Sequence, residues 1–166
     1  FERYEKIIIP GVGAYSNAIS KIRKKGFEKE IKKFALLNKK ILGICVGMQI
    51  LSEVGHEGGY NKGLELIEGE VGLISNSSNI SHVGWNNITI RKESRLFSGI
   101  KDNTDFYFVH SYCLNLKNEK EISTSINFYS KQITSSIEKE NIFGVQFHPE
   151  KSLISGLKIL KNFSDL

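Results

Sequence analysis

The stretch "KILGICVGMQIL" at residues 40–51 decides how this chain folds. An apolar run reaches Cys45, which has a glycine two positions before it and another two positions after it. This order predicts a buried strand over 40–44, a sharp turn at the cysteine and a helix over 46–53. Small residues on both sides of such a turn are typical of a nucleophile elbow, here with cysteine in place of serine. A cysteine buried only for packing explains the same stretch, so the pattern alone leaves both interpretations open.

Strands and helices alternate through the first half of the chain. The segment "YEKIIIPG" at 4–11 predicts a short buried strand that stops at Pro10, and residues 14–38 have helical patterning interrupted at Gly26. Buried β-branched runs that alternate with helices are typical of parallel sheets. We therefore expect an α/β fold with parallel strands.

The second half is richer in short strands. After a loop-rich middle over 55–79, in which "SNSSN" at 75–79 is the clearest flexible loop, strands are expected at 86–90, 105–112, 121–126, 132–137 and 141–147. Strands this short and closely spaced suggest hairpins attached to the parallel sheet.

A last helix is expected over 152–163. Ser152 is its candidate N-cap, and an apolar stripe is formed by Leu153, Leu157, Leu160 and Phe163.

Composition narrows the class of protein. The 166 residues, 40% hydrophobic and 25% charged, suit one globular domain over 1–166. No apolar run reaches the length of a membrane span. The net charge of +5 comes from lysine runs such as 21–33 that lack interleaved aromatics, so we expect solvated helix surface and no nucleic-acid partner. Two cysteines are too few for a disulfide framework, which favours a reducing cytoplasm.

Two other strand ends carry features that catalysis uses. In "GVQFHPE" at 144–150, a strand delivers His148, and Glu150 follows two positions later on the same side of an extended segment. In "PGVGAY" at 10–15, a glycine turn lets backbone N–H groups approach an anion. A strand cap and an ordinary turn are the plain alternatives. Because sites in open parallel sheets form at the carboxyl ends of strands, we expect all three features to meet.

Together these residues would form a nucleophile, a general base and an orienting carboxylate. Cys45 would attack, His148 would take its proton, and Glu150 would hold the imidazole. The backbone N–H of Val46 would face an oxyanion beside the sulfur. We also expect the start of the following helix to favour thiolate over thiol.

These motifs resemble those of class I glutamine amidotransferases. "GICVGMQIL" is similar to the family's nucleophile motif, "GVQFHPE" to its histidine–glutamate motif and "PGVG" to its oxyanion loop. "HVGWN", "FYFVHSY" and "HPEKS", at 82–86, 106–112 and 148–152, resemble in particular the glutaminase subunits of imidazole glycerol phosphate synthases. The resemblance implies a flavodoxin-like fold, with a mostly parallel central sheet, helices on both faces and added antiparallel strands.

The resemblance also implies a role for each matching residue. It assigns catalysis to Cys45, His148 and Glu150; oxyanion binding to the backbone of Gly11, Val12, Gly13 and Val46; glutamine binding to Gln49, His110, Ser111 and Tyr112; and a partner face to Trp85, Asn86 and Lys151. A core tryptophan, a surface lysine and ordinary strand-end histidines at His82 and His110 are the alternatives. L-Glutamine is the implied substrate, a cyclase or synthase subunit the implied heterodimer partner, and no cofactor or metal is implied.

The chain departs from the family at its start. Members open with a strand, a helix and another strand before the Pro-Gly turn, whereas nine residues precede Pro10 here. N-terminal strands are therefore expected to be missing, either because the chain is truncated or because its sheet is rearranged. Ser81 also stands where the subgroup usually has proline.

The leading hypothesis is a glutaminase subunit that supplies ammonia for imidazole glycerol phosphate synthesis in histidine biosynthesis. A paralogous subunit that feeds ammonia into nucleotide-sugar or surface-glycan precursors has the same chemistry. A non-catalytic module that retains the fold, and a cysteine hydrolase of another kind, are further alternatives.

Overall fold

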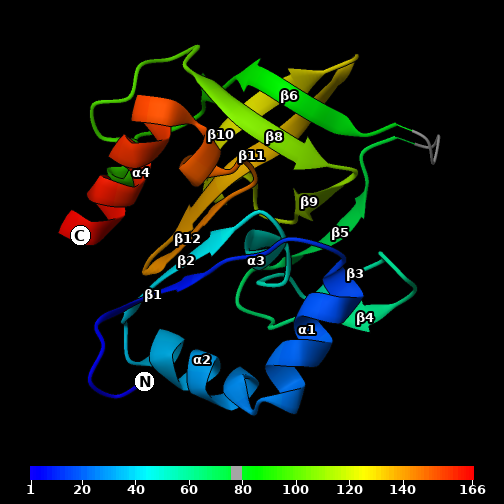
Figure 1. Cartoon of the computed structure of the whole chain (residues 1–166), viewed down its shortest axis with the longest axis vertical. Coiled ribbons are helices and arrows are strands. Elements are labelled where there is room, and N and C mark those ends of the chain that lie inside the picture. Colours follow the sequence, from blue (N-terminus) through cyan, green and yellow to red (C-terminus); the bar gives the residue numbers. More distant parts are fainter. Residues whose placement is uncertain (76–79) are drawn as a thin grey trace.

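The computed structural model describes residues 1–75 and 80–166 (Figure 1). Its first half contains β1 (Lys6–Ile9), α1 (Tyr15–Lys24), α2 (Phe27–Leu36), β2 (Lys40–Ile44), α3 (Val46–Gln49), β3 (Val54–Gly55), β4 (Asn61–Lys62) and β5 (Gly69–Leu73). The break predicted at Gly26 separates α1 from α2, and the strand predicted at 40–44 is β2. The loop predicted at 75–79 lies, apart from Ser75, outside the described residues.

Short strands and a last helix make up the second half. The strands are β6 (His82–Asn87), β7 (Thr89–Ile90), β8 (Asp105–His110), β9 (Tyr112–Leu116), β10 (Ile122–Phe128), β11 (Lys131–Lys139) and β12 (Ile142–Val145). The helices are three short 3₁₀ turns, η1 (Arg95–Phe97), η2 (Glu119–Glu121) and η3 (Pro149–Lys151), followed by α4 (Leu153–Asp165). Within residues 1–75 and 80–166, none of the helices combines the length and apolarity needed to cross a bilayer.

The central sheet is mixed, with strand order β1-β2-β12-β11-β10-β7. Parallel pairing is confined to β1–β2 and β2–β12, and the remaining pairs are antiparallel. The α/β class and the attached hairpins are therefore as predicted, although the sheet is less parallel than expected. In Figure 1, α1 and α2 lie on the opposite side of β1 and β2 from α4.

Two smaller sheets complete the described structure. One has the order β4-β3-β5-β9, and the other is the antiparallel pair β6–β8. The first includes three short strands from the middle region that the sequence indicated only as loop. The strand predicted at 105–112 is broken at Ser111, so that β8 and β9 join different sheets.

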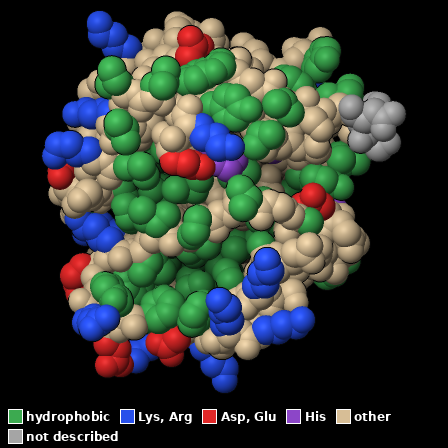
Figure 2. Space-filling model, viewed as in Figure 1, with side chains coloured by type: hydrophobic (Ala, Val, Ile, Leu, Met, Phe, Trp, Pro, Cys, Tyr) green, Lys and Arg blue, Asp and Glu red, His purple; other side chains and the backbone are tan. Residues whose placement is uncertain are grey.

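The first strand, β1, is less buried than predicted. It lies at the edge of the central sheet, where Ile9 is buried but Ile8 is 47% exposed. Side chains of β1, α1 and α2 line a groove of about 710 Å³, and Figure 2 shows hydrophobic side chains gathered over these elements. The apolar run of this strand therefore covers one side of the sheet edge instead of filling the core.

The turn at Cys45 depends on close packing of strand ends against α3. A Cβ on Gly47 would overlap the carbonyl oxygen of Ile9, and one on Gly43 would lie 2.6 Å from Met48 Cα. Neither obstacle is a flexible side chain, so both positions require glycine. This packing brings the end of β1 next to the elbow between β2 and α3.

The helix after Cys45 is shorter than predicted and ends at Gln49. The N–H groups of Leu51 and Ser52 donate to carbonyls three residues back, which tightens the chain into turns. Glu53 then donates its N–H to Gly69 O and joins the second sheet. Local patterning predicted a helix to residue 53. The helix ends earlier because the residues after it pair with the second sheet.

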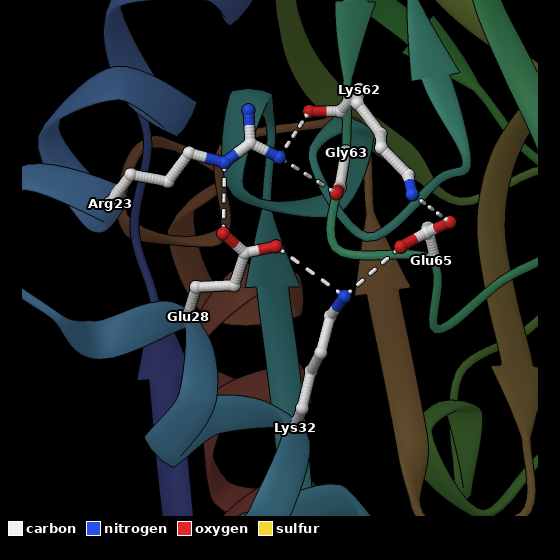
Figure 3. Close-up of polar contacts among 6 residues, drawn as sticks. All are labelled: Arg23, Glu28, Lys32, Lys62, Gly63 and Glu65. Carbon is white, nitrogen blue, oxygen red and sulfur yellow. Dashed lines mark hydrogen bonds and ion pairs between the residues drawn. The ribbon is translucent and has the colours of Figure 1, made fainter.

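A polar network holds α1 and α2 against the segment after β4 (Figure 3). Arg23 pairs with Glu28 at 2.8 Å and donates to the carbonyl of Lys62. Lys32 lies between Glu28 and Glu65, at 3.4 and 3.1 Å. Exposed pairs contribute little singly. Joined as a network, they fix the position of the segment between β4 and β5.

The apolar stripe predicted for the last helix is wrong in part. Leu153 and Leu157 are 72% and 64% exposed, whereas Ile159 and Phe163 are buried. Ser152 makes no side-chain cap. Its Oγ instead donates to His148 O at 2.7 Å and accepts from the backbone N–H of Tyr107 at 3.0 Å. These bonds set where α4 begins and hence which of its faces is buried.

We predict that Gly47→Ala lowers the free energy of unfolding by about 3 kcal/mol, because the new methyl group meets backbone that cannot rotate away. Urea unfolding followed by circular dichroism measures the change. Gly72→Ala in β5 is the matched control, since a Cβ there would meet Asn115 Nδ2 at an ordinary 3.6 Å. Equal unfolding midpoints for the two variants would contradict the packing described for the elbow.

Candidate active site

A small cavity of about 90 Å³ lies at the carboxyl ends of the parallel strands. It is lined by Val12, Gly13, Cys45, Val46, Gln49, Glu57, Val109, His110, Ser111, Tyr112 and His148. The predicted nucleophile, base, oxyanion loop and substrate-binding residues therefore meet at one place. Gly11 does not line the cavity; it packs on the backbone of Gly47.

The cysteine occupies a strained backbone conformation. Cys45 has φ 52° and ψ −115°, in the positive-φ region that side chains rarely adopt. Strain of this kind persists only where the surroundings enforce it, and it is concentrated at functional sites. The local conformation predicted for a nucleophile elbow is therefore present.

The Cys45 thiol is protonated at neutral pH. Burial raises its pKa to about 11; the Val46 N–H opposes this shift, and the carboxylates of Glu150 and Glu57 add to it. The Val46 N–H at the start of α3 acts in the expected direction, but burial is the larger effect, so the expected preference for thiolate is not reached. The nucleophile therefore needs a base.

His148 has the geometry of that base. Its Nδ1 lies 2.7 Å from Glu150 Oε1. Because a carboxylate oxygen accepts the bond, Nδ1 carries the proton and Nε2 has the free lone pair. Nε2 is buried and has no hydrogen-bond partner among the described residues, and the ring lines the same cavity as Cys45. A buried, unpaired acceptor is costly unless it has a use.

Two further residues of the site were missed by sequence reasoning. Gln146 lies in the same motif as His148, is fully buried and donates from Nε2 to the Cys45 sulfur at 3.6 Å. The strand alternation that pairs positions 146 and 148 could have found it. Glu57 lies in a loop and its Oε2 accepts from the Tyr15 N–H at 2.7 Å. No local pattern marks Glu57.

The residues expected to bind glutamine have clear partners. Gln49 donates from Nε2 to Tyr112 O at 2.9 Å and to Gln146 Oε1 at 3.0 Å. His110 uses Nδ1 toward Tyr112 O, and Ser111 pairs with Ser81 through their hydroxyls at 2.6 Å. These bonds give the cavity wall a defined shape.

Two of the three predicted partner residues, Trp85 and Lys151, contact the ring of Tyr107 beside the site. Trp85 is 50% exposed, so it is not a core tryptophan, and its ring meets Tyr107 edge-on at 5.9 Å. The Lys151 ammonium lies 5.8 Å from the same Tyr107 ring. Asn86 lies one position beyond Trp85 on β6 and is half-buried.

Comparison with known families decides the class. The family model described as "Glutamine amidotransferase class-I" matches residues 2–165. The chain belongs to the class I glutamine amidotransferases.

Among the curated relatives of this amidotransferase are proteins called imidazole glycerol phosphate synthase subunit HisH. That of Caldanaerobacter subterraneus subsp. tengcongensis is 45% identical over 99% of the chain and 81% of that protein. That of Pelagibacter ubique is 43% identical over 98% of the chain and 80% of that protein. The family assignment therefore extends over nearly the whole chain.

Solved structures share the amidotransferase fold. PurLQS from Thermotoga maritima superposes with a TM-score of 0.72 at 20% identity, over 99% of this chain and 81% of that one. A structure described as glutamine amidotransferase gives 0.70 at 17% identity, over 97% and 78%. Likeness at this identity establishes the fold alone.

We predict that Cys45 reacts slowly with iodoacetamide near neutral pH and that the rate rises about tenfold per pH unit up to pH 10, because the buried thiol ionises near 11. Alkylation is followed by mass spectrometry. Cys113 also has its pKa raised to about 11 by burial, so the Cys113→Ser variant isolates Cys45. A rate that levels off below pH 9 would show that the pKa of Cys45 lies well below 11 and would contradict the prediction.

Proposed function

We propose that this chain is the glutaminase subunit of an imidazole glycerol phosphate synthase. It hydrolyses L-glutamine to glutamate and ammonia and passes the ammonia to a cyclase partner in histidine biosynthesis. The observation that carries the chemistry is His148: its buried Nε2 has no hydrogen-bond partner within residues 1–75 and 80–166, and its ring lines the cavity that contains Cys45. The relatives called imidazole glycerol phosphate synthase subunit HisH support the assignment of this reaction to imidazole glycerol phosphate synthesis.

The first half of the reaction forms a thioester. His148 Nε2 takes the Cys45 proton, and the sulfur attacks the side-chain amide carbon of glutamine. The carbonyl oxygen becomes an oxyanion, which the Val46 N–H and the loop at Val12 and Gly13 would stabilise. The imidazolium is held by the Glu150 carboxylate through Nδ1. It then gives its proton to the leaving nitrogen, and ammonia departs.

The second half regenerates the enzyme. His148, neutral again, takes a proton from a water molecule, and the hydroxide attacks the thioester carbonyl. The C–S bond breaks, glutamate leaves, and the sulfur recovers its proton from the imidazolium. No oxidant, reductant or metal is required for this balance. An intact set of these groups in one cavity argues against a non-catalytic module.

The partner would dock on the face that carries Trp85, Tyr107 and Lys151. Tryptophan and tyrosine side chains are typical anchors of protein interfaces. The cluster is continuous with the site, because Tyr107 O accepts from the His148 backbone N–H at 2.9 Å. The same proposal assigns residues 1–166 to one glutaminase domain that acts in the cytoplasm.

We predict that the protein, assembled with the cyclase subunit of its own organism, releases ammonia from glutamine and that Cys45→Ala abolishes this release. The loss should exceed about 10³-fold, because no other group in the cavity replaces the nucleophile. Ammonia is measured by a coupled glutamate dehydrogenase assay. Cys113→Ala, which removes the buried thiol of β9, serves as control and should retain activity. Equal release by wild type and Cys45→Ala would contradict the proposal.

For the partner face, we predict that Lys151→Glu weakens binding of the cyclase subunit about tenfold, since it replaces the cation over Tyr107 with an anion next to Glu150. Isothermal titration calorimetry measures the dissociation constant. Lys29→Glu on α2 makes the same charge change on an exposed position of another element. An effect of the same size from both variants would mean that net charge, not this face, governs association.

A further inference from the structure

Two buried histidines lie side by side next to the cavity, and the proposed reaction uses neither as acid or base. His82 opens β6 and His110 closes β8, and the two residues are directly opposite each other in that antiparallel pair. His82 Nδ1 lies 3.1 Å from His110 Nε2. A buried polar pair of this kind has to be arranged so that one ring donates and the other accepts.

The surrounding acceptors determine which ring donates. His110 Nδ1 lies 2.8 Å from Tyr112 O, a carbonyl that can only accept, so this Nδ1 carries hydrogen and Nε2 has a lone pair. His82 Nδ1 must therefore donate to His110, which leaves His82 Nε2 as an acceptor. The Asn86 amide faces that nitrogen at 3.4 Å. Its NH₂ end is identified independently, because the same nitrogen donates to Asn127 O at 3.2 Å.

The surroundings keep both rings neutral. The His82 ring stacks on Phe108 at 4.8 Å and packs against Phe128 at 4.4 Å. Burial lowers the pKa of His82 and of His110 to about 4. Neither ring carries charge near pH 7, so the donor and acceptor order is maintained.

The same hydrogen-bond chain continues to the nucleophile. Tyr112 O, which accepts from His110, also accepts from Gln49 Nε2 at 2.9 Å. Gln49 donates its other N–H to Gln146 Oε1, and Gln146 donates to the Cys45 sulfur. Six contacts thus link Asn86 to the reacting sulfur, and they pass through the two histidines.

We propose that His82 is a positioning residue for glutamine binding: by donating to His110 it fixes the Tyr112 carbonyl, and with it the Gln49 amide on the cavity wall. This inference rests on the proposed glutaminase function. The outer end of this series of hydrogen bonds is Asn86, whose side chain lies on the same side of β6 as His82 and on the opposite side from Trp85.

Three variants of His82 separate this role from simple packing. Asparagine places its amide nitrogen near the position of Nδ1 and keeps a donor toward His110, glutamine reaches the position of Nε2 instead, and leucine keeps neither. In the complex with the cyclase subunit, His82→Gln and His82→Leu should lower kcat/KM for glutamine about tenfold, the value of one hydrogen bond, mainly through KM. His82→Asn should stay within about twofold of wild type. Equal losses in all three variants would overturn the proposal.

At the Asn86 end of this series of hydrogen bonds, two neighbouring residues provide a variant and its control. Asn86→Ala removes the donor to His82, whereas Asn87→Ala changes the next residue of β6, which is exposed and points to the opposite side of the strand. At saturating partner subunit, only Asn86→Ala should raise KM for glutamine, by about threefold because the 3.4 Å bond is long. Unchanged KM in Asn86→Ala would contradict the extension of the donor and acceptor order to Asn86.

A spectroscopic test is independent of catalysis. Long-range ¹H–¹⁵N correlation spectra at pH 7 should show hydrogen on Nδ1 in both His82 and His110, although free histidine favours hydrogen on Nε2. Loss of the His82 signals in His82→Asn provides the assignment. Hydrogen on Nε2 of His110 would overturn the proposal even in an active enzyme. Absence of glutaminase activity in the wild-type complex would instead reject the proposed function.

Discussion

The close approach of Gly47 to the carbonyl oxygen of Ile9 is the contact on which the rest of this site depends. It lets the end of β1 lie directly on α3, and Gly11 also packs on the backbone of Gly47. On the neighbouring strand, a Cβ at Gly144 would overlap the Met48 side chain. Because side chains are absent at these positions, three parallel strand ends converge within the reach of one cavity. The oxyanion loop, the nucleophile and the base each follow one of these strands.

This convergence buries the Cys45 thiol and so disfavours its ionised form, and the other motif residues compensate for that effect. The packing that positions Cys45 also removes it from water, so its thiol holds its proton more tightly than a free cysteine does. A reactive sulfur then requires a base that is neutral, correctly oriented and shielded. Glu150 supplies the orientation by taking the Nδ1 hydrogen of His148, and burial leaves Nε2 with no other partner among the described residues. The strained backbone of Cys45 and the unpaired Nε2 of His148 are thus both unfavourable for folding, and both result from the same packing of strand ends.

Beyond the triad, the cavity wall is a network of amides and neutral histidines. Gln49 and Gln146 link the sulfur to Tyr112, and His110 and His82 link Tyr112 to Asn86. Such a network has one self-consistent order of donors and acceptors, so a change at one end affects the other. Cys45, Gln49 and His110 were named from motifs and lie on this network, but the motifs do not reveal its order. Glu57, which no local pattern marks, joined the site only when distant segments were in place.

By itself, the sequence determined the features that arise within a few neighbouring residues. The strand at 40–44, the turn at Cys45, the break at Gly26 and the histidine–glutamate pair follow from local periodicity, glycine and proline. Tertiary structure alone decided that β1 lies at a sheet edge, that α3 ends at Gln49 and that α4 buries Ile159 instead of Leu157. It also decided the protonation of Cys45 and the tautomers of His82 and His110. The physical reason is that burial, helix phase and hydrogen-bond order depend on atoms contributed from far along the chain.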